Sequence, residues 1–147
     1  MTYEQALGRM AALCSTAEHC ESEIREKLQR AALTEADIQR IVDYLYDEQY
    51  MDTARYCRAV AHDRLRFAHW GRVKIQQSLR QRGLPESDIR HALDDLPSDE
   101  YSRVLEGLLE QKARSLHDED DYTRRGKLIR FAAGRGFTID EVLHALN

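Results

Sequence analysis

Apolar residues recur along this chain at helical spacing, and the same pattern occurs three times. Residues three and four positions apart lie on one face of a helix, so this spacing predicts amphipathic helices. Corresponding positions are 51 residues apart between the first and second copies and 53 apart between the second and third. So constant a period indicates a repeat architecture. The residues that carry it are Ile24, Leu28, Leu33, Ile38 and Val42, then Ile75, Leu79, Leu84, Ile89 and Leu93, then Leu128, Ala132, Phe137, Val142 and Leu146.

Each copy contains three segments of helical periodicity. The predicted helices cover residues 3–14, 17–31 and 35–47 in the first copy, 53–68 and two segments within 70–96 in the second, and 99–116, 122–133 and the residues after 138 in the third. Gly83 and Gly136 stand where a helix ends and a left-handed residue is favoured. Side chains that can cap a following helix stand at Thr34, Asp52, Ser98 and Thr138, the last with Glu141 in a capping box.

The pattern predicts an all-α fold of three tandem three-helix repeats, stacked into an elongated, curved, solenoid-like array. The hand of the curvature stays open. We expect the repeats to span residues 1–49, 50–97 and 98–147. A unit this small buries little apolar surface alone, so each repeat is expected to depend on its neighbours through a continuous core.

Composition excludes several classes of protein. Apolar residues make up 42% of the chain and charged residues 33%, which is typical of a folded, well-solvated protein. No apolar run approaches the roughly 20 residues of a membrane span, so a cytoplasmic location is expected. The cysteines are odd in number and lack Cys-x-x-Cys spacing, which favours reduced thiols. They are Cys14, Cys20 and Cys57.

The sequence contains no recognisable catalytic motif. It has no glycine-rich phosphate loop, no nucleophile and base at a familiar spacing, and no cluster of metal-ligand type. We therefore predict a protein that is not an enzyme and that needs no cofactor or metal.

Charge is distributed in blocks along the chain. The net charge is only −4, yet residues 1–54 carry 5 basic and 11 acidic side chains, and residues 55–90 carry 9 basic and 3 acidic ones. Residues 91–123 are again acidic, with 3 basic and 10 acidic side chains, and residues 124–147 carry 5 basic and 2 acidic ones. The basic blocks point to a partner with negative charge.

Within the basic blocks, arginines follow helical spacing. Arg55, Arg58, His62, Arg66 and His69 form one stripe in the second repeat, and Arg72 and Arg80 form another with Lys74 beside them. Arginine binds phosphate or carboxylate through a planar fork, so these stripes predict a surface for DNA or an acidic partner. The alternative is a solvated helix face. The predicted contact residues are Arg55, Arg58, Arg66, Arg72, Lys74, Arg80, Arg124, Lys127 and Arg130.

Three segments resemble the RecX family of bacterial regulators of the RecA recombinase. They are residues 50–56 (YMDTARY), residues 71–84 (GRVKIQQSLRQRGL) and residues 135–137 (RGF). The chain departs from the family pattern at Thr53, which replaces an acid, and at Ser78, which replaces a glutamate. Ala32 stands where the other repeats have glycine.

The resemblance implies an elongated helical protein that binds the groove of the RecA filament on single-stranded DNA. It would inhibit RecA ATP hydrolysis, strand exchange and filament extension, and so act in DNA recombination, DNA repair and the SOS response. We expect a monomer, with weak direct binding to DNA. Two alternatives stay open: a general nucleic-acid-binding module that places a helix in the major groove, and a protein-interaction scaffold without a DNA partner.

Overall fold

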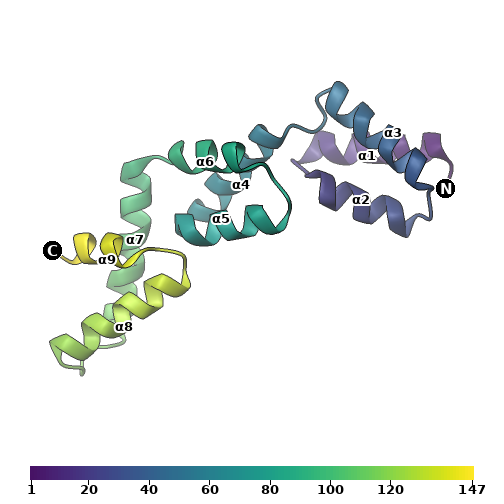
Figure 1. Ribbon diagram of the computed structural model, residues 1–147. Coiled ribbons are helices and arrows are strands. Elements are labelled where there is room, and N and C mark those ends of the chain that lie inside the picture. The colour runs from purple at the N-terminus through teal and green to yellow at the C-terminus, as the bar shows by residue number, and fades with distance from the viewer.

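The computed structural model describes all residues from Met1 to Asn147 and contains nine helices and no strand. They are α1 (Tyr3–Thr16), α2 (Glu21–Arg30), α3 (Glu35–Asp47), α4 (Thr53–Arg66), α5 (Arg72–Gln81), α6 (Glu86–Asp94), α7 (Ser98–Arg114), α8 (Asp121–Gly134) and α9 (Ile139–Leu146). Figure 1 shows α1–α3, α4–α6 and α7–α9 as successive groups arranged end to end, with the termini at opposite ends of an elongated molecule. We call them the first, second and third helix groups. The predicted all-α fold is confirmed. We keep 1–49, 50–97 and 98–147 as the proposed bounds of the repeats.

Most predicted helix ends are confirmed. The side chains of Thr34, Asp52 and Thr138 each accept a hydrogen bond from a backbone N–H in the first turn of α3, α4 and α9, respectively. Thr138 and Glu141 form the predicted capping box. The turn residues Gly83 and Gly136 have φ of 80° and 99°, in the left-handed region that glycine adopts at least cost.

Several predicted helix boundaries are wrong. α1 continues to Thr16 rather than ending at residue 14, and α7 ends at Arg114 rather than at residue 116. α2 begins at Glu21 rather than at residue 17, because residues 17–20 cross from α1 to α2 and Glu18 bonds to the second group instead. α4 ends at Arg66 rather than at residue 68, because the chain turns back through His69 with φ of 57°. Ser98 does not cap α7; it is the first helical residue and follows Pro97 at the cap position.

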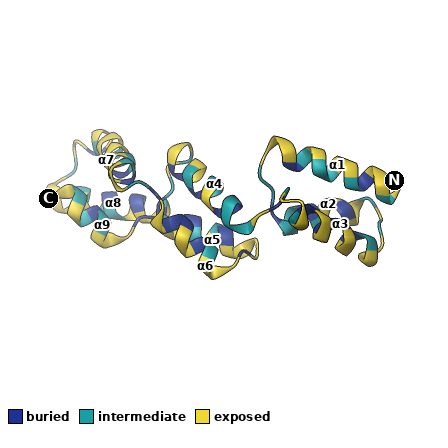
Figure 2. Cartoon of the chain, turned by 90° about the horizontal axis from the view of Figure 1, so that it is seen from above, coloured by how far each residue is buried: buried dark blue, intermediate teal, exposed yellow.

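We had expected a continuous hydrophobic core, but the core is divided into two clusters. One cluster fills the first helix group and includes Ile24, Ile38 and Leu45. A larger cluster runs through both the second and the third group, from Tyr56 to Val142, and also includes Cys20 from the link before α2. Figure 2 shows the buried residues on the inner sides of the helices and the exposed ones outside. The second and third groups therefore share one core, and the first group packs largely on its own.

Candidate binding surface

The predicted basic stripe on α4 begins at Arg55, which bonds to the first helix group. Its guanidinium Nε donates to Glu18 at 2.6 Å, and its Nη2 donates to the carbonyls of Gln49 and Tyr50 at 3.1 and 3.2 Å. Glu18 lies 37 residues earlier, in the link between α1 and α2. Arg55 therefore ties the first group to the second.

The rest of the α4 stripe is also largely engaged within the chain. Arg66 pairs with Glu100 of α7 through two hydrogen bonds of 3.0 and 3.3 Å. His62 lies 3.1 Å from Asp95 at the end of α6. Arg58 and His69 are exposed and form no ion pair. Two residues of this stripe, Arg55 and Arg66, therefore bond to neighbouring groups, and His62 bonds within its own group.

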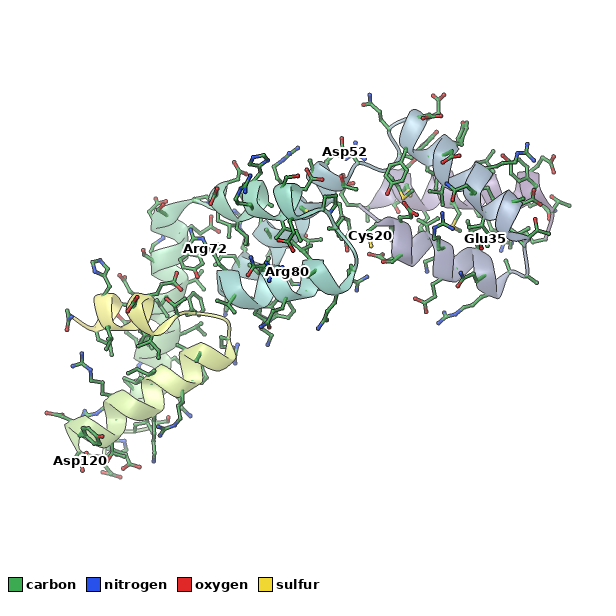
Figure 3. All side chains as sticks on the ribbon, viewed as in Figure 1. Cys20, Glu35, Asp52, Arg72, Arg80 and Asp120 are labelled. Carbon is green, nitrogen blue, oxygen red and sulfur yellow. The ribbon has the colours of Figure 1, made fainter.

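Glu23 of α2 is the centre of the contact between the first and second groups. It accepts hydrogen bonds from Tyr56 at 2.8 Å and from the Cys20 thiol at 3.2 Å, and it lies 2.9 Å from His19 and 3.0 Å from Arg82. Burial raises the pKa of Glu23, but these hydrogen bonds and the charge of Arg82 outweigh burial and leave its pKa below the usual range. Figure 3 shows Cys20 at the passage between the two groups.

The second and third groups meet at a seam of backbone hydrogen bonds. Gly71 N–H donates to the carbonyl of Arg135 at 2.8 Å, and Val73 N–H donates to that of Gly136 at 3.0 Å. Gly71 caps α5 without a side chain, so the turn between α8 and α9 supplies acceptors for the first turn of α5. A side chain at Gly71 would collide with the backbone of Gly136. Only glycine fits there.

Arg72 lies across this seam rather than in solvent (Figure 3). Its guanidinium stands 3.9 Å from the ring centre of Tyr101, 3.4 Å from Glu141 and 3.4 Å from the carbonyl oxygen of Leu93. Its backbone N–H donates to the Tyr101 hydroxyl at 3.0 Å. Burial raises the pKa of Tyr101 to about 12. The Tyr101 ring also packs on Phe137, with ring centres 5.2 Å apart.

The remaining predicted residues divide between paired and unpaired cations. Arg80 is exposed and pairs with Glu86 at 2.6 Å, whereas Lys74 stands 4.8 Å from the ring centre of Trp70 with no acidic partner. In α8, Arg124 pairs with Asp121 and Lys127 pairs with Glu119. Arg130 is exposed without an ion pair.

Comparison with known proteins decides the family. Residues 52–93 match the family model described as RecX, second three-helix domain, and residues 99–146 match RecX, third three-helix domain. A regulatory protein RecX of Leptothrix cholodnii is 30% identical over 139 residues, which cover 95% of this chain and 85% of that protein. This chain belongs to the RecX family of regulatory proteins.

Further relatives agree with this assignment. A RecX of Vibrio campbellii is 28% identical over 135 residues, which cover 92% of this chain and 85% of that protein. A crystal structure of a regulatory protein RecX has a TM-score of 0.87 at 24% identity and covers 98% of this chain and 72% of that one. The structure of RecX from Lactobacillus salivarius has the same TM-score at 16% identity, and covers 98% of this chain and 94% of that one. These two structures show the fold.

The family segments quoted from the sequence meet in space. The RGF segment at 135–137 supplies both carbonyls of the seam, and the segment at 71–84 supplies both donors. These motifs therefore hold the second and third groups together.

Other features of the structure bear on function. Cys14, Cys20 and Cys57 are buried and unpaired. No group of three or more His, Cys, Asp or Glu side chains could hold a metal ion. None of the helices has the length and apolar character needed to cross a membrane.

The sequence analysis missed a set of cations that lie on aromatic rings near the seam. Arg64 stands 5.0 Å from the ring centre of Trp70, and Lys112 and Arg135 stand 5.4 and 5.2 Å from that of Phe131. None of the three forms an ion pair. The available signal was the run of residues without Asp or Glu around each ring, which a search for helical stripes does not detect.

Proposed function

We propose that this protein regulates the RecA recombinase by binding in the groove of the RecA filament on single-stranded DNA. There it inhibits ATP hydrolysis, strand exchange and filament extension, and so modulates recombination, repair and the SOS response. Membership of the RecX family, through two domain models and a relative 30% identical, is the observation that carries this proposal. The protein acts without a cofactor, as a cytoplasmic monomer and not as an enzyme.

The shape and charge of the molecule support this role. Three helix groups arranged end to end give a long surface rather than a single pocket (Figure 1). Residues 55–90 carry 9 basic and 3 acidic side chains, whereas residues 1–54 carry 5 and 11. A basic middle next to an acidic end discourages wrapping on bare DNA and favours a composite partner of protein and DNA.

Among the nine predicted contact residues, three are available as direct contacts. Arg58, Lys74 and Arg130 have no acidic partner within the chain. The other six pair with an acid of the chain; the pairs of Arg55, Arg66 and Arg72 join different helix groups, and these residues act on binding through the arrangement of the groups. The six are Arg55, Arg66, Arg72, Arg80, Arg124 and Lys127.

The test is RecA ATPase activity on single-stranded DNA, measured with this protein at increasing ratios to RecA. Strong inhibition far below one protein per RecA indicates that filament ends are capped, and inhibition only near saturation indicates that the groove is coated. ATPase activity that stays unchanged at saturation would refute the proposed function. Protein that binds naked duplex tightly, with a steep salt dependence and no effect on RecA, would favour the general nucleic-acid-binding module.

A further inference from the structure

Two stretches of the chain contain no acidic residue, and the seam brings them together. Residues 64–85 and residues 122–139 contain neither Asp nor Glu. The first stretch donates and the second accepts the two hydrogen bonds of the seam, from Gly71 and Val73 to Arg135 and Gly136. Positive charge from two distant parts of the sequence is therefore concentrated on adjoining backbone. The cations of the first stretch are Arg64, Arg66, Arg72, Lys74, Arg80 and Arg82, and those of the second are Arg124, Arg125, Lys127, Arg130 and Arg135.

The ion pairs of the chain separate these cations into two sets. Six of them reach an acid elsewhere: Arg66, Arg72, Arg80, Arg82, Arg124 and Lys127. Five form no ion pair: Arg64, Lys74, Arg125, Arg130 and Arg135. The second set carries charge that the fold does not neutralise.

Aromatic rings position the unpaired cations next to the seam. Arg64 and Lys74 stand 5.0 and 4.8 Å from the ring centre of Trp70. Arg135 and Lys112, which comes from α7, stand 5.2 and 5.4 Å from that of Phe131. A cation on a ring face keeps its full charge and loses side-chain freedom before any ligand arrives, so binding costs less conformational entropy.

A hollow beside the Phe131 ring reaches the turn that precedes Trp70. His69, from the turn before Trp70, lines it together with Lys112, Phe131 and Arg135, and no acidic side chain contributes. The backbone connects them as well, since Trp70 N–H donates to the carbonyl of Arg64 at 3.0 Å and the next residue, Gly71, donates to that of Arg135. The four cations, the two rings and His69 thus form one surface, which we name the seam surface.

Beside the seam surface stands an aromatic side chain that the fold leaves in solvent. Phe67 lies in the turn between Arg64 and Trp70 and is 74% exposed. Phe67 is three positions from both Arg64 and Trp70 in the sequence. An exposed phenyl ring together with unpaired cations is the combination that binds single-stranded nucleic acid, because bases stack on the ring while phosphates contact the cations. The carboxylates of an acidic protein segment would supply negative charge for the cations but no aromatic base to stack on Phe67.

We propose that the seam surface binds single-stranded nucleic acid directly, with Arg64, Lys74, Lys112 and Arg135 on the phosphates and Phe67 stacked on a base. This proposal assigns named residues to the DNA contact of the proposed function. It rests on the proposed function only for the place of this contact within the RecA filament. Arg55, His62 and Arg66 of the α4 stripe lie outside this contact, because they are engaged with Glu18, Asp95 and Glu100.

The test measures binding of a fluorescent oligothymidylate to the full chain by anisotropy across a series of salt concentrations, without RecA. The variant Lys74→Ala/Arg135→Ala should bind about tenfold or more weakly, and its salt slope should fall by about 1.4, because each lost phosphate contact removes about 0.7 on a single strand. Phe67→Ala should weaken binding roughly five- to 150-fold, and Phe67→Trp should restore it.

Matched controls make the result decisive. Arg9→Ala/Lys27→Ala removes two exposed, unpaired cations from the first helix group and changes the net charge equally; it should bind like the wild type. Equal weakening by this control, or an unchanged salt slope in the seam variant, would overturn the proposal. Two results together would instead assign the surface to an acidic protein. Polyglutamate would displace the oligonucleotide from the wild type but not from the seam variant, and Phe67→Ala would not change oligonucleotide binding. Failure here leaves inhibition of RecA ATPase untouched, so the two proposals fail separately.

Discussion

Replacement of Gly71 by alanine tests the seam between the second and third helix groups. A Cβ atom at position 71 would lie 2.5 Å from the carbonyl carbon of Gly136 and 2.7 Å from the backbone nitrogen of Phe137. Both are backbone atoms, so no side-chain rotation can relieve the clash. The seam would have to open by about 1 Å to reach ordinary contact distance.

The magnitude follows from what that opening breaks. Two seam hydrogen bonds, of 2.8 and 3.0 Å, contribute about 1 kcal/mol each. Forcing a methyl group into closely packed structure costs a further 1–3 kcal/mol or so. Gly71→Ala should therefore lower the free energy of unfolding by about 3–5 kcal/mol, a large part of the roughly 5–15 kcal/mol of a typical domain.

The assay is urea unfolding followed by circular dichroism. Gly107→Ala is the matched control, because a Cβ atom at Gly107 in α7 meets nothing within 4 Å. Alanine is favoured over glycine inside a helix by about 1 kcal/mol, so this control should be slightly more stable than the wild type. A Gly71→Ala protein as stable as the wild type would refute the account of the seam.

Three further predictions concern single side chains. Glu23→Gln should lower the free energy of unfolding at neutral pH by about 1–3 kcal/mol, because hydrogen bonds to a charged group are lost. The folded-state pKa of Glu23 lies below its usual 4.5, so its contribution to stability is complete above pH 4.5 and is lost as the pH falls through the folded-state pKa. Thermal unfolding followed down to about pH 3 should therefore show a smaller loss of stability with acid in the variant than in the wild type. An equal loss in the two proteins would contradict this. Ala32→Gly should stabilise the chain by up to about 1 kcal/mol, because Ala32 has φ of 60°, a left-handed conformation that glycine adopts at less cost than alanine. A lower melting temperature of the variant would contradict this. Tyr101→Phe should cost about 1 kcal/mol in urea unfolding, because Arg72 N–H loses its acceptor, and no loss would show that water replaces the hydroxyl.

Local patterns in the sequence were sufficient to predict the helices. Apolar spacing and capping residues are properties of short segments, so Thr34, Asp52 and the Thr138 capping box could be recognised before any tertiary contact was known. The start of α2 was missed because Ala17 and Glu18 are good helix formers, and the contact between Glu18 and Arg55 overrides that preference.

The use of the basic residues could not be predicted in the same way. Periodicity showed that Arg55, His62 and Arg66 share a face of α4, and they do. Asp95 lies 33 residues away in sequence and meets this face through the packing of α6 on α4. Glu100 and Glu18 lie 34 and 37 residues away, and they meet it only because of how successive helix groups are oriented. That orientation is set by the seam and by Glu23, and no local pattern encodes it.

The measurement that tests the central claim most directly is RecA ATPase activity on single-stranded DNA, with wild type, Lys74→Ala/Arg135→Ala and Arg9→Ala/Lys27→Ala compared at the same ratios to RecA. The account predicts strong inhibition by the wild type and by the first-group variant, and weak inhibition by the seam variant. Absence of inhibition by the wild type at saturation would contradict the regulatory role on RecA. Inhibition by the seam variant equal to that of the wild type would contradict the assignment of the seam surface.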